Sequence, residues 1–482
     1  MAGSRVQGVD KSESQGWSSR SAFILAAIGA AVGLGNIWRF PTLAGESGGG
    51  AFVLVYFLFV ALLGLPMVLT EILLGRAGAG HASASGSVAE VARRSRRSTS
   101  WAFFGGLEVL TAFLILSFYS VIAGWVLNYV FVSAGDFFGA LISGNPFAGA
   151  FAGETKDEVV GRMGALFASP WQMIGLHALF MSITLLIVAG GVHGGIEKAA
   201  TWLMPGFFVL LILITIYGAF TGDFGAALSF LFTPDFSKLT PGALNEALGQ
   251  AFFSLSLGSA AMITYGSYVS NDVKLAPTAA TIAACDTGVA ILAGLMIFPI
   301  VFSAGLDPAA GPALIFQSLP VAFQSMPAGA LIGFLFFILI FFAALTSSIS
   351  LLEGSVAWAI DRFGMPRFAA SLLMGGATFL IGCACALGYN VWSDVRLLGF
   401  WSIFAETDIL DTIDGFTARV TLPLAGLGLS IFVGWRADRR LVYAQSGLEG
   451  AMFGLWRAII CWLAPLAIFL VMLFGLFPGL LA

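Results

Sequence analysis

Charged side chains are scarce in this sequence. Asp, Glu, Lys and Arg make up 10% of its 482 residues, whereas a soluble globular domain carries about 25%. The lysines and arginines form no block suited to a phosphate backbone, which argues against nucleic-acid binding. Hydrophobic residues make up 59%, and runs of about 20 apolar residues, the length of a membrane-crossing helix, recur from Ser21 almost to the end. The composition therefore predicts an all-α polytopic membrane protein.

Histidine and cysteine are also rare. The three histidines are scattered without metal-site spacing, and the four cysteines lie in apolar runs without a CxxC pair, so neither a zinc centre nor a disulfide framework is expected. Residues 75–80 are glycine-rich but lack the Gly-Lys-Ser/Thr ending of a phosphate-binding loop. These absences argue against ATP-driven pumping and against a membrane-embedded enzyme, which would need a metal or a nucleophile with its base.

The hydrophobic runs predict eleven membrane-spanning helices. They are centred on Ser21–Pro41, Ala51–Glu71, Trp101–Val132, Trp171–Gly190, Trp202–Phe220, Pro241–Tyr268, Thr278–Ala304, Ala328–Ile360, Phe368–Tyr389, Thr407–Gly434 and Met452–Phe477. The longest connections are expected at residues 133–170 and 390–406. Residues 1–16 are polar and unlike a cleavable signal peptide, so we expect a flexible cytoplasmic tail there and a single transmembrane domain over residues 17–482.

The distribution of lysine and arginine predicts the orientation in the membrane. With the N-terminus inside, 16 of the 22 basic residues fall in inner segments and six in outer ones, as expected for loops that retain positive charge in the cytoplasm. An odd number of spans then places Ala482 outside. The expected location is the plasma (cytoplasmic or inner) membrane.

Two spans interrupt the pattern of continuous apolar helix. Residues 29–36 place three glycines and an asparagine in the first span, and residues 254–259 place serines and a glycine in the sixth. Glycine destabilises a helix interior by about 1 kcal/mol, and such backbone is tolerated in a membrane where it lines a cavity. Close helix packing is the alternative explanation. Breaks five spans apart indicate an inverted repeat of five plus five helices, over residues 21–220 and 241–435, with an extra helix at 452–477.

The broken spans also carry a family signature. The run Gly29–Pro41, followed by Gly48–Phe52, resembles that of the neurotransmitter:sodium symporter family, and so do Gly249–Gly258, Ile263–Tyr268 and Leu345–Ile349. Their order and spacing match over spans one to ten. The resemblance, to the amino-acid-transporting bacterial branch in particular, implies sodium-coupled import of an amino acid by alternating access. A channel or an amino-acid receptor built on the same fold is the remaining alternative.

The resemblance implies two co-transported sodium ions. The first would bind the carboxylate of the amino acid together with Ala31, Asn36, Ser254 and Asp286. The second would bind carbonyls of Gly29, Val32 and Ala343 and hydroxyls of Thr346 and Ser347. Those two hydroxyls could instead bond back to their own helix. Asn36 and Asp286 favour a functional reading on their own, because polar groups within a membrane are costly.

Asp286 replaces the asparagine that is commonest at this position in the family. In chloride-dependent relatives an anion lies beside the first sodium ion. Tyr56, Gln250 and Ser254 match residues around that anion, while Ala290 replaces a serine there. We therefore expect the Asp286 carboxylate to take the place of chloride.

The resemblance also implies how the amino acid would be held. Amides of Leu34 and Gly35, with the Tyr119 hydroxyl, would bind its carboxylate. The carbonyls of Ala31, Phe253 and Ser254 and the Ser256 hydroxyl would face its amino group, and its side chain would lie among Ile115, Phe253, Ser259 and Leu351. Gly33 stands where monoamine transporters carry an aspartate, which favours a zwitterion. The small Ser259 leaves room for a hydrophobic or aromatic side chain in a neutral L-amino acid.

Gate residues complete the expected site. Arg39 and Asp414 match an outer pair, although Arg39 could also be a snorkelling anchor. Tyr268 and Asp361 match inner gate residues. The arginine that usually partners them is replaced by Ser14, and Lys11 is the candidate substitute.

Overall fold

The computed structural model describes residues 16–78, 80–309, 311 and 313–480. Almost all of the expected tail at residues 1–16, including Lys11 and Ser14, lies outside these residues. Within the described part, all regular elements are helices, and pairing of extended backbone is limited to one isolated bridge between Gly49 and Pro234. This matches the all-α prediction.

The helices are described in two groups, those before residue 241 and those from residue 241 onward. The first group is α1 (Arg20–Ala31), α2 (Phe40–Glu46), α3 (Gly50–Phe59), α4 (Leu65–Ala77), α5 (Ala84–Arg94), α6 (Ala102–Ile142), α7 (Lys156–Phe167), α8 (Pro170–Ala189), α9 (Lys198–Thr221) and α10 (Phe224–Phe232). The second group is α11 (Pro241–Ser254), α12 (Ala261–Ser267), α13 (Leu275–Ser303), α14 (Leu319–Ser325), α15 (Gly329–Phe363), α16 (Arg367–Leu387), α17 (Ile409–Phe416), α18 (Leu422–Ile431), α19 (Arg439–Ser446), α20 (Gly450–Ala458) and α21 (Ala464–Leu476).

Short wide turns with π-helical hydrogen bonding connect several of these helices into longer rods. They are η1 (Gly35–Arg39), η2 (Val60–Gly64), η4 (Val192–Glu197), η6 (Leu314–Ser318), η8 (Thr417–Thr421), η9 (Phe432–Arg436) and η10 (Ile459–Leu463). Five of them end just before a proline in the next helix: Pro41, Pro66, Pro320, Pro423 and Pro465. Proline has no N–H and clashes with the carbonyl four residues earlier, so the wider turn accommodates it without breaking the rod.

Nine helical stretches in the described part are long and apolar enough to cross a membrane, and α1 with η1 and α2, bent by 51°, makes a tenth. This count differs from the eleven spans expected. The difference is the sixth span, where α11 and α12 are separated by residues 255–260 and each is too short to cross alone. The expected loop at 133–170 is also partly helical, because α6 runs on to Ile142 and α7 lies within it.

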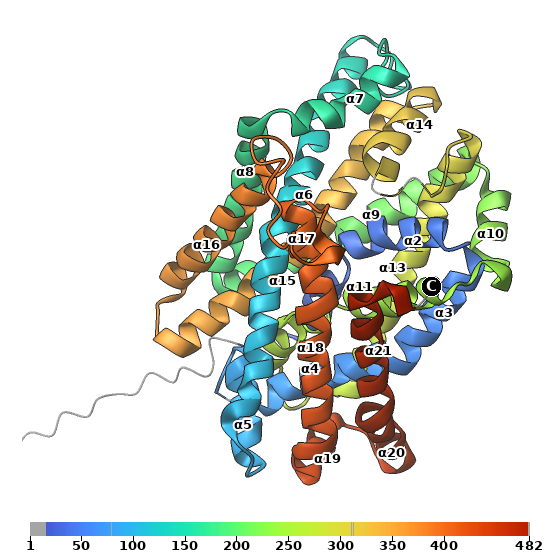
Figure 1. Cartoon of the computed structure of the whole chain (residues 1–482). Coiled ribbons are helices and arrows are strands. Elements are labelled where there is room, and N and C mark those ends of the chain that lie inside the picture. Colours follow the sequence, from blue (N-terminus) through green and yellow to red (C-terminus); the bar gives the residue numbers. More distant parts are fainter. Residues whose placement is uncertain (1–15, 79, 310, 312, 481–482) are drawn as a thin grey trace, which may run out of the picture.

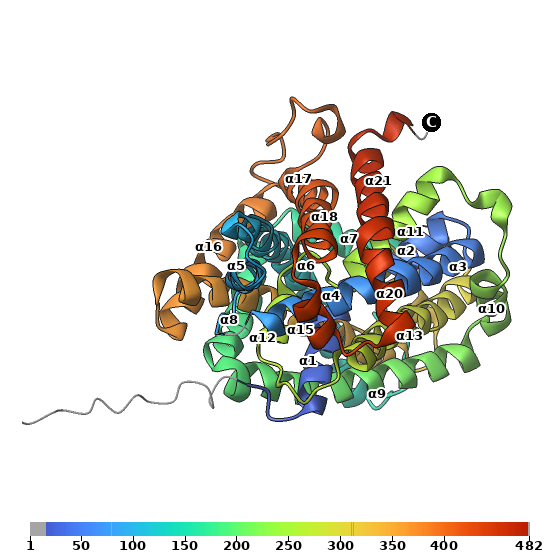
Figure 2. The ribbon, with the colours of Figure 1, turned by 90° about the horizontal axis from the view of Figure 1, so that it is seen from below.

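The two interrupted spans lie inside the bundle. Viewed from below, α1, α12 and α15 are near the middle, and α9, α10 and α16 lie towards the outside (Figure 2). The rod formed by α20 and α21 is mostly exposed. Of the residues in its apolar stretch, 22% are buried inside the bundle, against 83% for the span that contains α6. The ends of the bundle differ: α7 and α14 stand at one end, and α5 and α19 at the other (Figure 1). The interruptions of the first and sixth spans are therefore surrounded by other helices (Figure 2).

Candidate functional site

The first break lies between α1 and η1. The helix ends when Val32 turns to an extended conformation, and regular structure resumes at Gly35. Gly33, between them, lies against α15 and α6: a Cβ atom there would come within 2.5 Å of the Ser347 hydroxyl and 3.2 Å of the Tyr119 hydroxyl. This close approach explains the need for glycine. Backbone groups of the break are consequently free of helical hydrogen bonds.

The second break joins α11 to α12. Ser256, Gly258 and Ala260 all have positive φ angles, of 53°, 74° and 60°, which prevents a helix from continuing. The Ser256 hydroxyl donates to the Ala30 carbonyl at 2.7 Å. The two breaks are thus in direct contact.

A buried polar cluster lies beside the breaks. The Asn36 amide nitrogen donates to the Asp286 carboxylate at 2.7 Å and to the Ser254 hydroxyl at 2.9 Å, and the Ser254 hydroxyl donates to the other Asp286 oxygen at 2.7 Å. Tyr56 reaches Ser254 and Asp286 at 3.3 and 3.4 Å. These four side chains are at most 1% exposed. Spans one, two, six and seven therefore bring them together.

The Asn36 amide is oriented differently from the expectation. Its side-chain oxygen accepts the Gly33 N–H at 3.1 Å, and its nitrogen faces the carboxylate. The reason is that Asp286 offers only acceptors, so the amide presents its donors. Gln250 is fully buried nearby and donates to the Gly35 carbonyl at 2.9 Å, while its own oxygen has no partner among the described residues.

The second group of expected sodium ligands lies where α15 crosses the first break. The Ser347 hydroxyl is 3.2 Å from the Val32 carbonyl oxygen and 3.4 Å from that of Gly29. Thr346, by contrast, donates to the Phe342 and Ala343 carbonyls of its own helix. The Ser347 hydroxyl therefore faces the first break, whereas the Thr346 hydroxyl bonds back to its own helix, which is the alternative considered for both residues.

A small cavity of about 40 Å³ lies between the two breaks. All expected substrate residues except Ser254 line it; they are Ala31, Leu34, Gly35, Ile115, Tyr119, Phe253, Ser256, Ser259 and Leu351. Leu422 also contributes to the wall. The Leu34 N–H points to the Tyr119 hydroxyl at 3.5 Å. The cavity thus has amide and hydroxyl groups at one side and mainly apolar side chains elsewhere.

A larger cavity of about 440 Å³ lies beyond it, on the side of α7. Leu34, Gly35, Tyr119 and Phe253 line both cavities and so separate them. Only the larger one includes Trp38, Arg39, Asp411 and Asp414. This wide chamber, called the vestibule below, leads to the site from one end of the bundle.

The expected outer pair of Arg39 and Asp414 is not formed. Arg39 instead pairs with Glu246 on α11 at 3.6 Å, and its guanidinium lies over the Phe253 ring at 4.9 Å. Asp414 lies in the same vestibule without an ion pair among the described residues. The vestibule lies between η1 and α17, so Arg39 pairs with the carboxylate on α11 instead.

The opposite end of the site is sealed by aromatic and charged contacts. Trp17 donates to the Tyr265 carbonyl at 3.0 Å and packs edge-on against Tyr268. The Tyr268 hydroxyl donates to Glu353 at 2.7 Å, and Arg367 binds both oxygens of Glu353 at 2.7 Å. Glu353 is fully buried. A two-pronged ion pair of this kind fixes α15 to α16.

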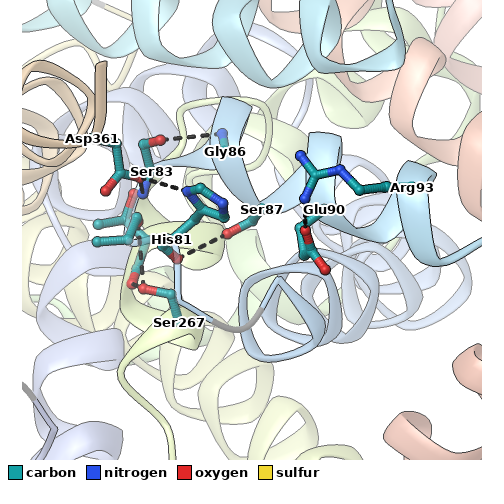
Figure 3. Close-up of polar contacts among 10 residues, drawn as sticks. His81, Ser83, Gly86, Ser87, Glu90, Arg93, Ser267 and Asp361 are labelled. Carbon is teal, nitrogen blue, oxygen red and sulfur yellow. Dashed lines mark hydrogen bonds and ion pairs between the residues drawn. The ribbon is translucent and has the colours of Figure 1, made fainter. Parts of the chain in front are cut away.

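Asp361 has separate partners from Tyr268. It accepts the Ser83 N–H at 2.8 Å and lies 3.9 Å from His81, at the start of α5 (Figure 3). Further along α5, Glu90 pairs with Arg93. The two expected inner gate residues are therefore on one end of the bundle but do not contact each other by hydrogen bonds.

Sequence reasoning missed Glu246, Glu353 and Arg367. Glu353 carried a usable signal, because it is a carboxylate in the apolar part of the 35-residue helix α15, two turns before the charged end with Asp361. Glu246 carried none, since it lies near the polar beginning of α11. Arg367 was counted only among the basic residues of the inner segments.

Comparisons with known proteins agree with this geometry. Residues 14–138 and 158–476 match the model of the sodium:neurotransmitter symporter family. An uncharacterized sodium-dependent transporter of Bacillus subtilis, YhdH, is 36% identical over 95% of this chain and 96% of its own length. Another uncharacterized sodium-dependent transporter, from Haemophilus influenzae, is 34% identical over 96% of this chain and 98% of its own.

A solved structure extends the likeness to three dimensions. The crystal structure of MhsT in complex with L-phenylalanine superposes with a TM-score of 0.84 at 41% identity, and the match covers 96% of this chain and 99% of MhsT. The chain therefore belongs to the sodium:neurotransmitter symporter family, and it is a sodium-dependent, multi-pass membrane transporter and not an enzyme.

Proposed function

We propose that this transporter imports a neutral, hydrophobic or aromatic L-amino acid together with sodium, without chloride, by alternating access across the plasma (inner) membrane. The observation that supports this most directly is the small cavity between the breaks, where the Leu34 N–H, the Tyr119 hydroxyl and the Ser256 hydroxyl meet apolar walls. These groups match the carboxylate, amino group and side chain of an amino acid.

The architecture proposed for this function has eleven spans. The sixth consists of α11 and α12 with the turn between them, which corresponds to the bent first span. Residues 21–220 and 241–435 form two inverted repeats, and 452–477 an extra helix, within one domain over residues 17–482. The N-terminus lies in the cytoplasm and the C-terminus outside, so that the vestibule faces outward.

The first sodium ion would bind beside Asp286. Asn36, Ser254 and Asp286 already converge there, and the carbonyl of Ala31 and the amino-acid carboxylate would complete the oxygen shell. The Asn36 amide must first turn its oxygen inward and release the Gly33 N–H. Because sodium and the amino acid share a contact, binding of each strengthens binding of the other.

The second sodium ion would bind between α1 and α15. The Ser347 hydroxyl and the Val32 and Gly29 carbonyls are gathered already. Thr346 would join by rotating its hydroxyl away from its own helix, and Ala343 would add a carbonyl. An ion held there would fasten the first break to α15.

Chloride independence rests on the buried carboxylate. Asp286 supplies a fixed negative charge between Tyr56, Ser254 and Asn36, so a further anion there would meet like-charge repulsion. This favours a transporter that needs sodium but no chloride.

The side chain of the amino acid would enter between Ile115, Ser259 and Leu351. The cavity of about 40 Å³ has room for only a few water molecules. Phe253 and Tyr119 must therefore separate to admit the amino acid and close again above it. Arg39 would then exchange Glu246 for Asp414, while Tyr268 and Asp361 belong to the contacts that open inward.

Uptake into proteoliposomes tests the proposal. Radiolabelled L-phenylalanine should accumulate only under an inward sodium gradient and should generate a positive inward current, because a zwitterion moves with cations. Thermal-shift screening of twenty amino acids, with and without sodium, would identify the best ligand. Sodium-independent flux would contradict the proposal, and binding without flux would indicate a receptor.

A further inference from the structure

Two fully buried carboxyl groups lie outside the proposed sodium and amino-acid sites. Glu71 is on α4 and Glu108 is on α6, and both are 0% exposed. Both approach the turn between α11 and α12. The Gly258 N–H donates to Glu71 at 2.9 Å, and the Ala260 amide lies near Glu108 without a hydrogen bond of normal geometry.

Both carboxyl groups approach the same short turn, Glu71 at Gly258 and Glu108 near Ala260, two residues further along the chain. Three of their four oxygens, one on Glu71 and both on Glu108, have no hydrogen-bond partner in the described part of the chain. Neither residue forms an ion pair among the described residues. Two buried carboxylates at one turn, without a cation, are strongly unfavourable. One proton removes a charge and supplies the missing donor.

Titratable groups on several neighbouring elements are bound to partners of their own. Arg76 on α4 binds Val273 and Gln445. Glu353 on α15 is bound to Arg367 and Tyr268, and Asp286 on α13 to Asn36 and Ser254. Tyr265 of α12 lies against Trp17. On α5, Glu90 and Arg93 pair with each other, and Arg94 binds the Ala77 carbonyl. Arg367 of α16 binds Glu353. The missing donor is therefore supplied by a proton and not by a neighbouring cation.

The helices that carry the pair differ in their attachment to the second break. α4 and α12 pack backbone to backbone: a Cβ on Gly75 would come within 2.0 Å of the Ile263 carbonyl oxygen, and one on Gly266 within 2.6 Å of that of Ile72. Glu71 must therefore move with α12. Glu108 is on α6, which packs along the long helix α15. The pair thus spans the boundary between the broken-helix unit and the helices around it.

We propose that Glu71 and Glu108 form a proton-binding site that holds one shared proton in this conformation and makes the transport cycle depend on pH. The inference rests on the proposed alternating access, in which α4 and α12 rock against α6. Rocking would separate the carboxyl groups and hydrate them, and the proton would leave to water. Since the closed pair has the higher proton affinity, acid favours the conformation seen here and alkaline pH favours the other.

Difference infrared spectroscopy of the intact protein in liposomes tests for the proton directly. Wild type should show the C=O stretch of a protonated carboxyl group, shifted in heavy water, and this band should titrate with pH. Glu108→Gln should abolish it, because a glutamine amide donates to Glu71 and leaves that group ionised. The matched control is Glu90→Gln, which removes a carboxyl group from α5 and should retain the band.

Two further measurements keep the outcome decisive. Glu71→Gln should also abolish the band, so the test does not depend on one variant folding. Hydrogen exchange of residues 255–267, corrected for intrinsic rates, should vary with pH in wild type and not in Glu108→Gln. The same band in wild type and both variants would overturn the inference, as would a band that disappears when sodium replaces choline, since a metal ion would then occupy the pair. Failure of amino-acid uptake with the band intact would instead contradict the proposed function.

Discussion

Gly33 lies so close to Ser347 that a Cβ atom on the glycine would come within 2.5 Å of the serine hydroxyl. This contact joins the break in the first span to the middle of α15. The same hydroxyl faces the carbonyls of Val32 and Gly29, which are proposed to bind the second sodium ion. The space beside Gly33 therefore controls whether the ion site can form.

Replacement of Gly33 by alanine should weaken sodium binding. The added methyl group would force the Ser347 hydroxyl to rotate away from the Val32 and Gly29 carbonyls. Sodium-dependent amino-acid binding, measured by equilibrium titration, should require a higher sodium concentration. Gly106→Ala on α6 is the matched control, because nothing lies within 4 Å of the added atom. Equal sodium dependence in both variants would contradict the assignment.

Replacement of Asp286 by asparagine should create a chloride requirement. The variant loses the fixed negative charge beside Asn36 and Ser254, and a chloride ion could restore it. Uptake by wild type should be the same in chloride and gluconate, whereas the variant should be slow in gluconate and faster in chloride. A wild-type protein stimulated by chloride would refute this role.

Ser259 should decide the size of the amino acid. Its side chain lines the cavity between the breaks, and Ser259→Phe would fill the space proposed for an aromatic ring. Discrimination in such pockets amounts to about 1–3 kcal/mol, or about 10- to 200-fold. Competition assays should show that preference moves from phenylalanine to alanine. An unchanged order of preference would place the ring elsewhere.

The two acids near Arg39 should have different effects on transport. Glu246 holds the arginine in the open vestibule, whereas Asp414 is proposed to hold it after closure. Asp414→Asn should therefore slow uptake while leaving sodium binding intact, and Glu246→Gln should favour closure. Rates of substrate release after dilution measure this difference. Slower closure in Glu246→Gln than in Asp414→Asn would reverse the assignment.

Loss of Glu353 should destabilise the protein. Glu353→Gln would leave Arg367 with one partner fewer in a largely buried position, and breaking a buried pair costs about 3–5 kcal/mol. The Tm in detergent should fall, and the double variant Glu353→Gln, Arg367→Gln should recover part of the loss. A double variant that is less stable than the single one would argue that each residue has other partners.

Residues that are out of place in an apolar helix were the most predictable part of the fold and the site. Gly33, Asn36 and Asp286 stand out because a membrane penalises flexible or polar groups, and the structure brings them together at the first break. The class of fold and the family followed from the same segments. The sixth span was harder to verify, because α11 is short and has polar residues such as Glu246 and Gln250.

Partners chosen by tertiary packing could not be predicted. Arg39 has two candidate acidic partners, Glu246 on α11 and Asp414 on α17, and only the structure shows that Glu246 is the one paired in this conformation. The orientation of the Asn36 amide likewise depends on the Asp286 carboxylate opposite it. Glu108 was hidden in a predicted apolar span, where one carboxyl group did not change the hydrophobic pattern.

The wide turn at Val60–Gly64 also determines which way each side chain of the following helix, α4, points. An α-helix advances about 100° per residue, so deletion of one residue there would turn α4 by that angle about its axis. Glu71 would then face another part of the bundle, and Gly75 would no longer lie against Ile263. The second span would keep nearly the same length and hydropathy but would no longer fit against α12 and the second break. The one residue that a π-helical turn adds to an α-helical turn is therefore a geometric requirement of the site.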